Sequence, residues 1–298
     1  MLGRTRAPVA KYLRHALQAV KKATRGGPPT TVMRPRGGVI ARKIRYNRDF
    51  RPKIDPVRAN YLAMAALIPL IVIAVIALIG VAIYFAHLRE KQRTEALAAV
   101  AAQLGWSFSP DREYGYDTLH PKIGAFNRGH TRFAHNLMRG EARFEIPGSP
   151  AVHLPTVGGD YHYQITTSNG KNTQTTTYRF SFLLVRLPVG VREDLTIRPE
   201  SIFDKIKAGI GFDDIDFESA EFSDRFYVQG SDKRFAYDLI HPRMMEHLME
   251  TDPLPIAISR GHLCYTKGNG RWEPEEFGRH LHWLEGFFAH WPRHLELT

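Results

Sequence analysis

The stretch LAMAALIPLIVIAVIALIGVAIYF runs from Leu62 to Phe85, inside thirty positions between Arg58 and Arg89 that carry no Lys, Arg, Asp or Glu. A helix needs about 20 apolar residues to cross about 30 Å of hydrocarbon, so this segment is long enough to span a membrane with some tilt. A helix that is apolar on every face would otherwise need a large protein packed around it. We therefore predict one transmembrane helix over residues 59–88.

A cleaved export signal is the main alternative for this segment. It fits poorly, because the charged region before the apolar run would be 58 residues long and the run itself is too long. The small-x-small tripeptide Ala96-Leu97-Ala98 is also separated from the apolar run by the charged segment Arg89–Arg93. We predict an anchor that is not cleaved.

The charges that flank the predicted span indicate its orientation. The twenty residues after it carry Arg89, Lys91 and Arg93, whereas the twenty before it carry seven Lys and Arg residues. Positive charge accumulates on the cytoplasmic side of membrane proteins. We expect a single-pass protein of the cell membrane with a cytoplasmic N-terminus and an extracytoplasmic C-terminal domain.

The net charge of +11 comes from the N-terminal tail. Residues 1–58 hold sixteen Lys and Arg against two Asp, while the remaining 240 residues have a slight acidic excess. We predict a largely disordered tail with a short amphipathic helix at residues 8–22, facing anionic lipid head groups. The residues predicted to contact the membrane surface are Lys11, Arg14, Lys21, Lys22, Arg42, Lys43, Arg45 and Arg48. Nucleic-acid binding is a weaker alternative, because no motif for it is present.

The rest of the chain predicts one α+β domain over residues 89–298. Residues 161–188 alternate around Asn169-Gly170, which indicates a β-hairpin, and residues 255–268 indicate another that turns at Arg260-Gly261. Residues 106–150 indicate short strands and turns. A final helix from Pro274 places one apolar stripe against the sheet: Phe277, Leu281, Leu284, Phe288 and Trp291. The expected fold is an antiparallel sheet covered by this C-terminal helix.

The region between these hairpins contains a run of carboxylates: Asp213, Asp214, Asp216, Glu218, Glu221 and Asp224. Alternation with Ile215 and Phe217 predicts a strand with one solvated acidic face. The run lacks the spacing of a calcium-binding loop. Asp232 is expected to cap a helix that Pro242 kinks or divides in two.

Metal and cofactor chemistry is not indicated. His280 and His282 diverge on a helix, and Pro292 separates His290 from His294. The only cysteine, Cys264, is flanked by strand-forming residues and is expected to be a small core residue. Motifs for a nucleophile elbow, a phosphate-binding loop, a dinucleotide fold or a zinc protease are absent. We predict no cofactor, no metal and no catalytic residue.

Residues 216–249, DFESAEFSDRFYVQGSDKRFAYDLIHPRMMEHLM, resemble the characteristic segment of a family of bacterial membrane-anchored proteins whose function is unknown. The matching residues are Phe217, Glu218, Ser219, Phe222, Phe226, Val228, Asp232, Ala236, Leu239, Pro242 and Leu248. Relative to that family, residues 144–158 look like an insertion. The resemblance implies a membrane anchor followed by an α+β domain, and it carries no activity.

The functional expectation is a single-pass membrane protein with a non-catalytic binding, sensory or scaffolding domain at the cell envelope. Its partners would be the lipid bilayer, anionic lipid head groups and a protein that the sequence does not identify. The alternative is a membrane-tethered, metal-dependent hydrolase that uses the carboxylates between Asp213 and Asp224.

Overall fold

A computed structural model describes residues 56–148, 150–188, 190–200, 215–293 and 295 of the protein. The chain divides into two units, Met1–Leu67 and Ile68–Thr298. The predicted tail helix and all eight predicted membrane-surface residues lie outside the described residues. The architecture below is that of the second unit.

Helix α2 (Pro56–Gln103) carries the apolar run and continues for about five turns beyond it. Its segment Leu67–Gln103 is long and apolar enough to cross a membrane, and none of its most apolar stretch is buried. Ile76 and Leu78, near the middle of the run, are 63% and 68% exposed. Within the described residues, the structure therefore shows one helix that is long and apolar enough to be a membrane-spanning candidate.

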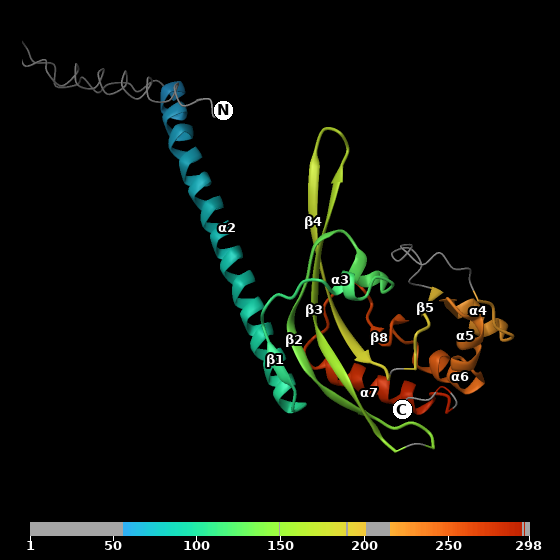
Figure 1. Ribbon diagram of the computed structural model, residues 1–298. Coiled ribbons are helices and arrows are strands. Elements are labelled where there is room, and N and C mark those ends of the chain that lie inside the picture. The colour runs from blue at the N-terminus through green and yellow to red at the C-terminus, as the bar shows by residue number, and fades with distance from the viewer. Residues whose placement is uncertain (1–55, 149, 189, 201–214, 294, 296–298) are drawn as a thin grey trace, which may run out of the picture. The chain divides into compact units, whose positions relative to one another are not determined.

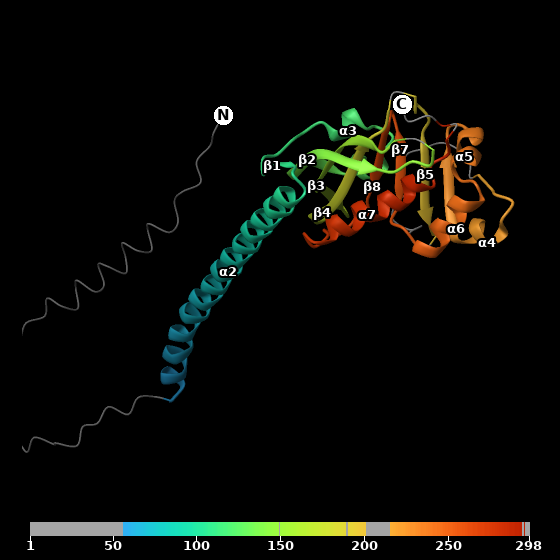
Figure 2. The same cartoon turned by 90° about the horizontal axis from the view of Figure 1, so that it is seen from below.

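An antiparallel sheet of eight strands forms the centre of the domain, in the order β1-β2-β3-β4-β8-β7-β5-β6 (Figures 1 and 2). The strands are β1 (Ser107–Ser109), β2 (His130–Phe144), β3 (Val152–Ser168), β4 (Thr173–Arg186), β5 (Leu195–Pro199), β6 (Phe226–Gly230), β7 (Ile256–Ser259) and β8 (His262–Tyr265). The predicted α+β arrangement, with an antiparallel sheet and a C-terminal helix, is confirmed.

Both predicted hairpins are present. Strands β3 and β4 pair from Ser168↔Thr173 inward, with the turn at Asn169-Gly170, and β7 and β8 turn at Arg260-Gly261. The expectation of short strands in 106–150 is wrong for β2, which is 15 residues long. Two register shifts, with Asn136 at a φ of 52°, interrupt the alternation that would have revealed one strand. The second half of the apparent insertion at 144–158 is the first part of β3.

Helix α7 (Glu276–Ala289) crosses one face of the sheet (Figures 1 and 2). The whole predicted stripe is buried: Phe277, Leu281, Leu284, Phe288 and Trp291. Phe288 contacts Phe144 of β2, with ring centroids 4.3 Å apart. Leu97 and Ala101 of α2 join the same apolar cluster, so two helices share this face.

The opposite face is covered by the segment that contains α3 (Tyr116–Leu119) and the 3₁₀ helix η1 (Gly124–Asn127). Phe126 of this segment packs on Tyr161 of β3, whose hydroxyl donates to the Phe126 carbonyl at 2.9 Å. Cys264 is 1% exposed in this cluster, and burial raises the pKa of its thiol. The interpretation of Cys264 as a core residue is confirmed.

Three short helices lie between β5 and β7 in the chain: α4 (Ala220–Arg225), which precedes β6, and α5 (Lys233–Leu239) and α6 (Pro242–Thr251), which follow it. Asp232 caps α5 by accepting from the Arg234 N–H, and Pro242 begins a separate helix, as predicted. The predicted strand around residues 214–218 is not a strand in its described part, although Ile215 and Phe217 are buried and Asp216 and Glu218 are exposed.

Two glycines should respond oppositely to alanine. A Cβ at Gly140 would lie 2.1 Å from the Trp106 ring, whereas one at Gly278 on the exposed side of α7 meets nothing within 4 Å. We expect Gly140→Ala to lower the free energy of unfolding by about 1–3 kcal/mol. Gly278→Ala should raise it by about 0.5–1 kcal/mol through helix propensity. Urea unfolding followed by tryptophan fluorescence measures both; loss of stability in both variants would contradict this packing.

Candidate functional site

The most deeply buried carboxylate of the described residues lies where α2 meets the sheet. Glu90, Arg93 and Thr94 are spaced i, i+3, i+4 and continue the stripe that buries Leu97 and Ala101. The same helical face is therefore polar close to the apolar run and apolar farther along. This polar part is brought against a single buried carboxylate on β3.

Asp160 is that carboxylate, and its side chain is fully buried. The Arg93 guanidinium donates to both of its oxygens at 2.7 Å, and the Ser181 hydroxyl donates to Oδ1 at 2.7 Å. Arg93 also donates to the Trp272 carbonyl at 2.7 Å. This fork-to-carboxylate pair satisfies the charge of Asp160 and fixes α2 to β3, β4 and the segment before α7.

The electrostatics agree with a permanently ionised pair. Burial by itself would raise the pKa of the Asp160 carboxyl, but hydrogen bonds and charge from Arg93 outweigh it and hold that pKa below its usual value. Ser181 donates to Asp160 and accepts from Arg93 and from the Trp272 N–H. Because its proton and lone pairs are engaged and it is fully buried, Ser181 is unsuited to act as a nucleophile.

A second ion pair lies at the edge of this cluster. Arg271 donates to both carboxylate oxygens of Glu90, at 2.7 and 2.9 Å, and lies 4.0 Å from Asp160. From the sequence, Arg93 was considered only as one of the positive charges that orient the membrane span. Glu90, Asp160 and Arg271 were not predicted to be site residues. The available signal was the i, i+3 spacing of Glu90 and Arg93 ahead of Leu97 on one helical face.

A surface groove lies between residues 216–219, α5 and α6, with a volume of about 710 Å³. We call it the acidic groove. Its walls include Phe217, Tyr237, Met245 and Met249, and its charged groups are Asp216, Glu218 and Glu246, with no Lys or Arg among its lining residues.

Hydrogen bonds fix the walls of the acidic groove. The Tyr237 hydroxyl donates to the Asp216 carbonyl at 3.1 Å, and its ring packs against Phe217 at 5.3 Å. Ser219 caps α4 by accepting from the Phe222 N–H. Tyr237 remains 47% exposed, so an aromatic face is available to a ligand.

The predicted run of carboxylates does not assemble into one site. Asp216 and Glu218 line the acidic groove, whereas Glu221 and Asp224 are exposed on α4 and do not line it. Asp213 and Asp214 lie outside the described residues. Among the described residues, no three His, Cys, Asp or Glu side chains are grouped to hold a metal ion.

The histidines singled out in the sequence are dispersed. His280 packs on Trp272 at 4.1 Å, and His282 contacts the Glu285 carboxylate at 2.9 Å. His290 stacks on His247 at 4.6 Å, and His294 lies outside the described residues.

Comparison with known proteins leaves the family open. No family model matches the chain, and no curated protein matches it. One solved structure, the crystal structure of the mycobacterial trehalose monomycolate transport factor A, TtfA, is 11% identical and has a TM-score of 0.44, covering 67% of this chain and 96% of that one. The resemblance noted for residues 216–249 stays a prediction.

Proposed function

We propose that this protein is a single-pass membrane protein whose domain is a non-catalytic binding module at the cell envelope. Its acidic groove would take a segment of a partner protein that carries apolar side chains flanked by Lys or Arg. The observation that supports this most directly is the groove itself, because aromatic and methionine side chains line it together with three carboxylates. In the proposed topology the tail is cytoplasmic and the domain is extracytoplasmic.

The chemistry of the groove favours a peptide over a reacting substrate. Met245 and Met249 are half-buried on the groove side of α6, and flexible thioethers adapt to varied apolar partners. Asp216, Glu218 and Glu246 are exposed, so their charges suit the recognition of cations at a rim more than proton transfer. In the described part of the chain, no three His, Cys, Asp or Glu side chains are grouped to hold a metal ion, and the Ser219 hydroxyl on the groove wall serves as a helix cap.

The buried ion pair between Arg93 of α2 and Asp160 of β3, which we call the junction, supports a scaffolding role. Because Arg93 belongs to the same continuous helix as the apolar run, the buried pair ties the domain to its anchor without a flexible linker. A partner held in the groove would then be tethered to the membrane through α2.

In-membrane photo-crosslinking of the full chain tests the groove. A photoreactive residue at position 249 should give a discrete adduct, while one at exposed Leu119 should not. Mass spectrometry should show that the cross-linked peptide combines apolar residues with Lys or Arg. Because each rim charge pair contributes up to about 1 kcal/mol, Glu218→Lys with Glu246→Lys should reduce the adduct about tenfold.

Glu145→Lys is the matched control, because this exposed residue lies outside the acidic groove. It should leave the adduct unchanged. An adduct that survives the double charge reversal would overturn the proposal, as would an acidic cross-linked peptide. An adduct between two copies of this chain would assign the groove to self-association instead.

A further inference from the structure

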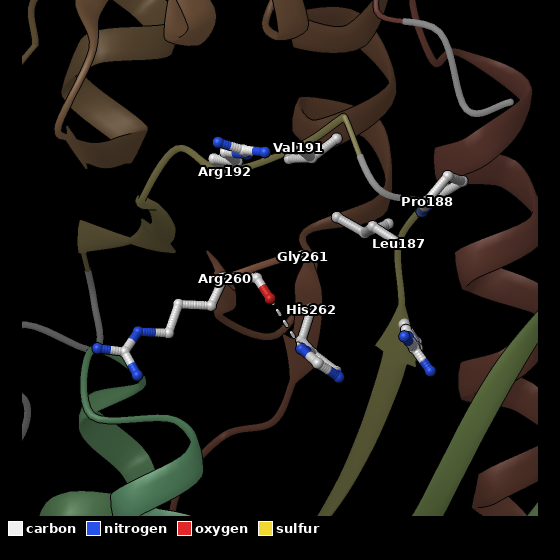
Figure 3. A pocket seen from close by; sticks show the side chains of 8 residues that line it. Leu187, Pro188, Val191, Arg192, Arg260, Gly261 and His262 are labelled. Atoms are coloured by element: carbon white, nitrogen blue, oxygen red, sulfur yellow. Dashed lines mark hydrogen bonds between the residues drawn. The ribbon is translucent and has the colours of Figure 1, made fainter.

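A second hollow lies at the far end of β4, with a volume of about 600 Å³ (Figure 3). We call it the arginine hollow. It is lined by the end of β4 and the loop after it, Arg186 to Pro188, by Val191 and Arg192, and by the β7–β8 turn, Arg260 to His262. Figure 3 shows Arg192 on the segment that follows β4, and Arg260 and His262 together on the β7–β8 turn.

The charge of the arginine hollow is one-sided. Three arginines and one histidine line it, and no Asp or Glu does. Seven other arginines of the described residues form ion pairs with carboxylates: Arg93, Arg132, Arg139, Arg143, Arg234, Arg271 and Arg279. In the same part of the chain, Arg186, Arg192 and Arg260 form none.

Nearby carboxylates do not neutralise these arginines. Glu193 accepts from the backbone N–H of Arg192 at 2.9 Å, and Asp194 accepts from the Ser259 hydroxyl at 2.7 Å. Like charges around one hollow repel each other, and an anion bound between them would replace that repulsion with attraction.

A backbone hydrogen bond and the geometry of the β7–β8 turn fix the walls of the arginine hollow. The Leu187 N–H donates to the Gly261 carbonyl at 2.7 Å, which ties the end of β4 to the β7–β8 turn. Both turn residues have positive φ, 50° at Arg260 and 71° at Gly261, as in the two-residue turns that match hairpin twist. Asn is the usual residue at the first position, so Arg260 occupies it at a conformational cost of about 1 kcal/mol. Its side chain is the feature that would justify that cost.

The β7–β8 turn orients the ring of His262, which as a neutral imidazole leaves no free donor for the hollow. The His262 Nδ1 lies 3.1 Å from the Arg260 carbonyl, which only accepts, so Nδ1 carries the proton. His120, 94% buried, packs edgewise on this ring at 4.7 Å, and its own Nδ1 has no hydrogen-bond partner within the described structure. The buried His120 ring therefore packs directly against the His262 ring.

We propose that the arginine hollow binds a phosphoryl group, contacted by the guanidinium groups of Arg186, Arg192 and Arg260. Guanidinium forks match phosphate oxygens with paired hydrogen bonds, which a lysine does not provide. Leu187, Pro188 and Val191 give the hollow an apolar wall, which suits a phosphate ester whose organic part lies against them. A soluble phosphate and a lipid head group both present this chemistry, and the experiment below distinguishes them.

Calorimetric titration of the full chain in an uncharged detergent tests this site with two probes. One probe is inorganic pyrophosphate and the other is a short-chain phosphatidic acid, each compared with chloride at equal ionic strength. Binding of pyrophosphate, alone or with the lipid, supports the proposal and indicates a soluble ligand. Binding of the lipid alone supports it and indicates a head group only if Arg260→Asn weakens that binding, because the basic tail is itself predicted to contact anionic lipid. Binding of neither probe above the chloride control overturns it.

Arg260→Asn separates the site from folding, because Asn favours this turn. It should weaken probe binding about tenfold or more by removing one paired contact. Arg234→Gln is the control, since its side chain is 90% exposed and away from the arginine hollow. Equal affinity in Arg260→Asn and the parent protein, or equal weakening by Arg234→Gln, would also overturn the proposal. Neither outcome bears on the acidic groove.

Discussion

Arg93→Met should lower the free energy of unfolding of the domain by about 3–5 kcal/mol, because it leaves a buried carboxylate without its counter-charge. Asp160 is fully buried and takes two of its short hydrogen bonds from Arg93. With methionine at position 93, the Ser181 hydroxyl is the strongest remaining donor to that carboxylate. Urea unfolding of the full chain in an uncharged detergent measures the loss, and all four tryptophans of the sequence lie within the domain to report it.

Lys91→Met is the matched control, two positions away on the same helix. Lys91 and its partner Glu95 are both mostly exposed, so the change should be below about 1 kcal/mol. Adding Asp160→Leu to Arg93→Met should recover much of the loss, because an apolar pair can replace a buried ion pair at little net cost. If Arg93→Met were as mild as Lys91→Met, the junction would not be a buried contact in the folded protein.

The features that could be predicted from the sequence are local ones. The stripe on α7 and the turn at Arg260-Gly261 each depend on residues within a few positions of one another. The same holds for the cap at Asp232, where the donor is two residues away. Propensity and periodicity act over this range, so the elements and their type followed from the amino acids alone.

The junction could not be predicted in this way. Asp160 follows Gly158-Gly159 in a strand and has no neighbour in sequence that indicates a buried charge. Its partner Arg93 lies 67 positions away, and the two meet only because α2 crosses the sheet beside β3 and β4. The arginine hollow has the same character, since it depends on the end of β4 reaching the β7–β8 turn.

Two misinterpretations have physical causes. Bulges in β2 broke its alternation into pieces that resembled separate short strands. Around residues 215–218 the alternation is real, but it reflects a segment that packs Ile215 and Phe217 inward, and the described residues there belong to no strand. Alternation of apolar and polar residues indicates that one side of a segment is buried. It does not indicate that the segment pairs with a neighbouring strand.

Two aspartates in the middle of the apolar run should release the protein from the membrane. Residues 62–85 contain fourteen Leu, Ile, Val and Phe residues, which together contribute about −4 to −8 kcal/mol to insertion. Ile73→Asp with Ile76→Asp removes two of them and adds about 2.5–3.5 kcal/mol per aspartate near the helix centre, which brings the sum close to zero or above. The fraction of full-length protein that stays in the membrane pellet after alkaline carbonate extraction should fall from nearly all to a minority.

The same two charges placed outside the run provide the control. His87→Asp with Gln92→Asp changes two exposed positions of α2 beyond Phe85, where a carboxylate can remain in water. That variant should stay in the pellet, since the apolar run is intact and the domain face of the helix is untouched. Should the Ile73→Asp, Ile76→Asp variant pellet as fully as the control, lipid transfer of residues 62–85 would not be what holds the chain at the membrane. The envelope location proposed for the acidic groove would then be lost.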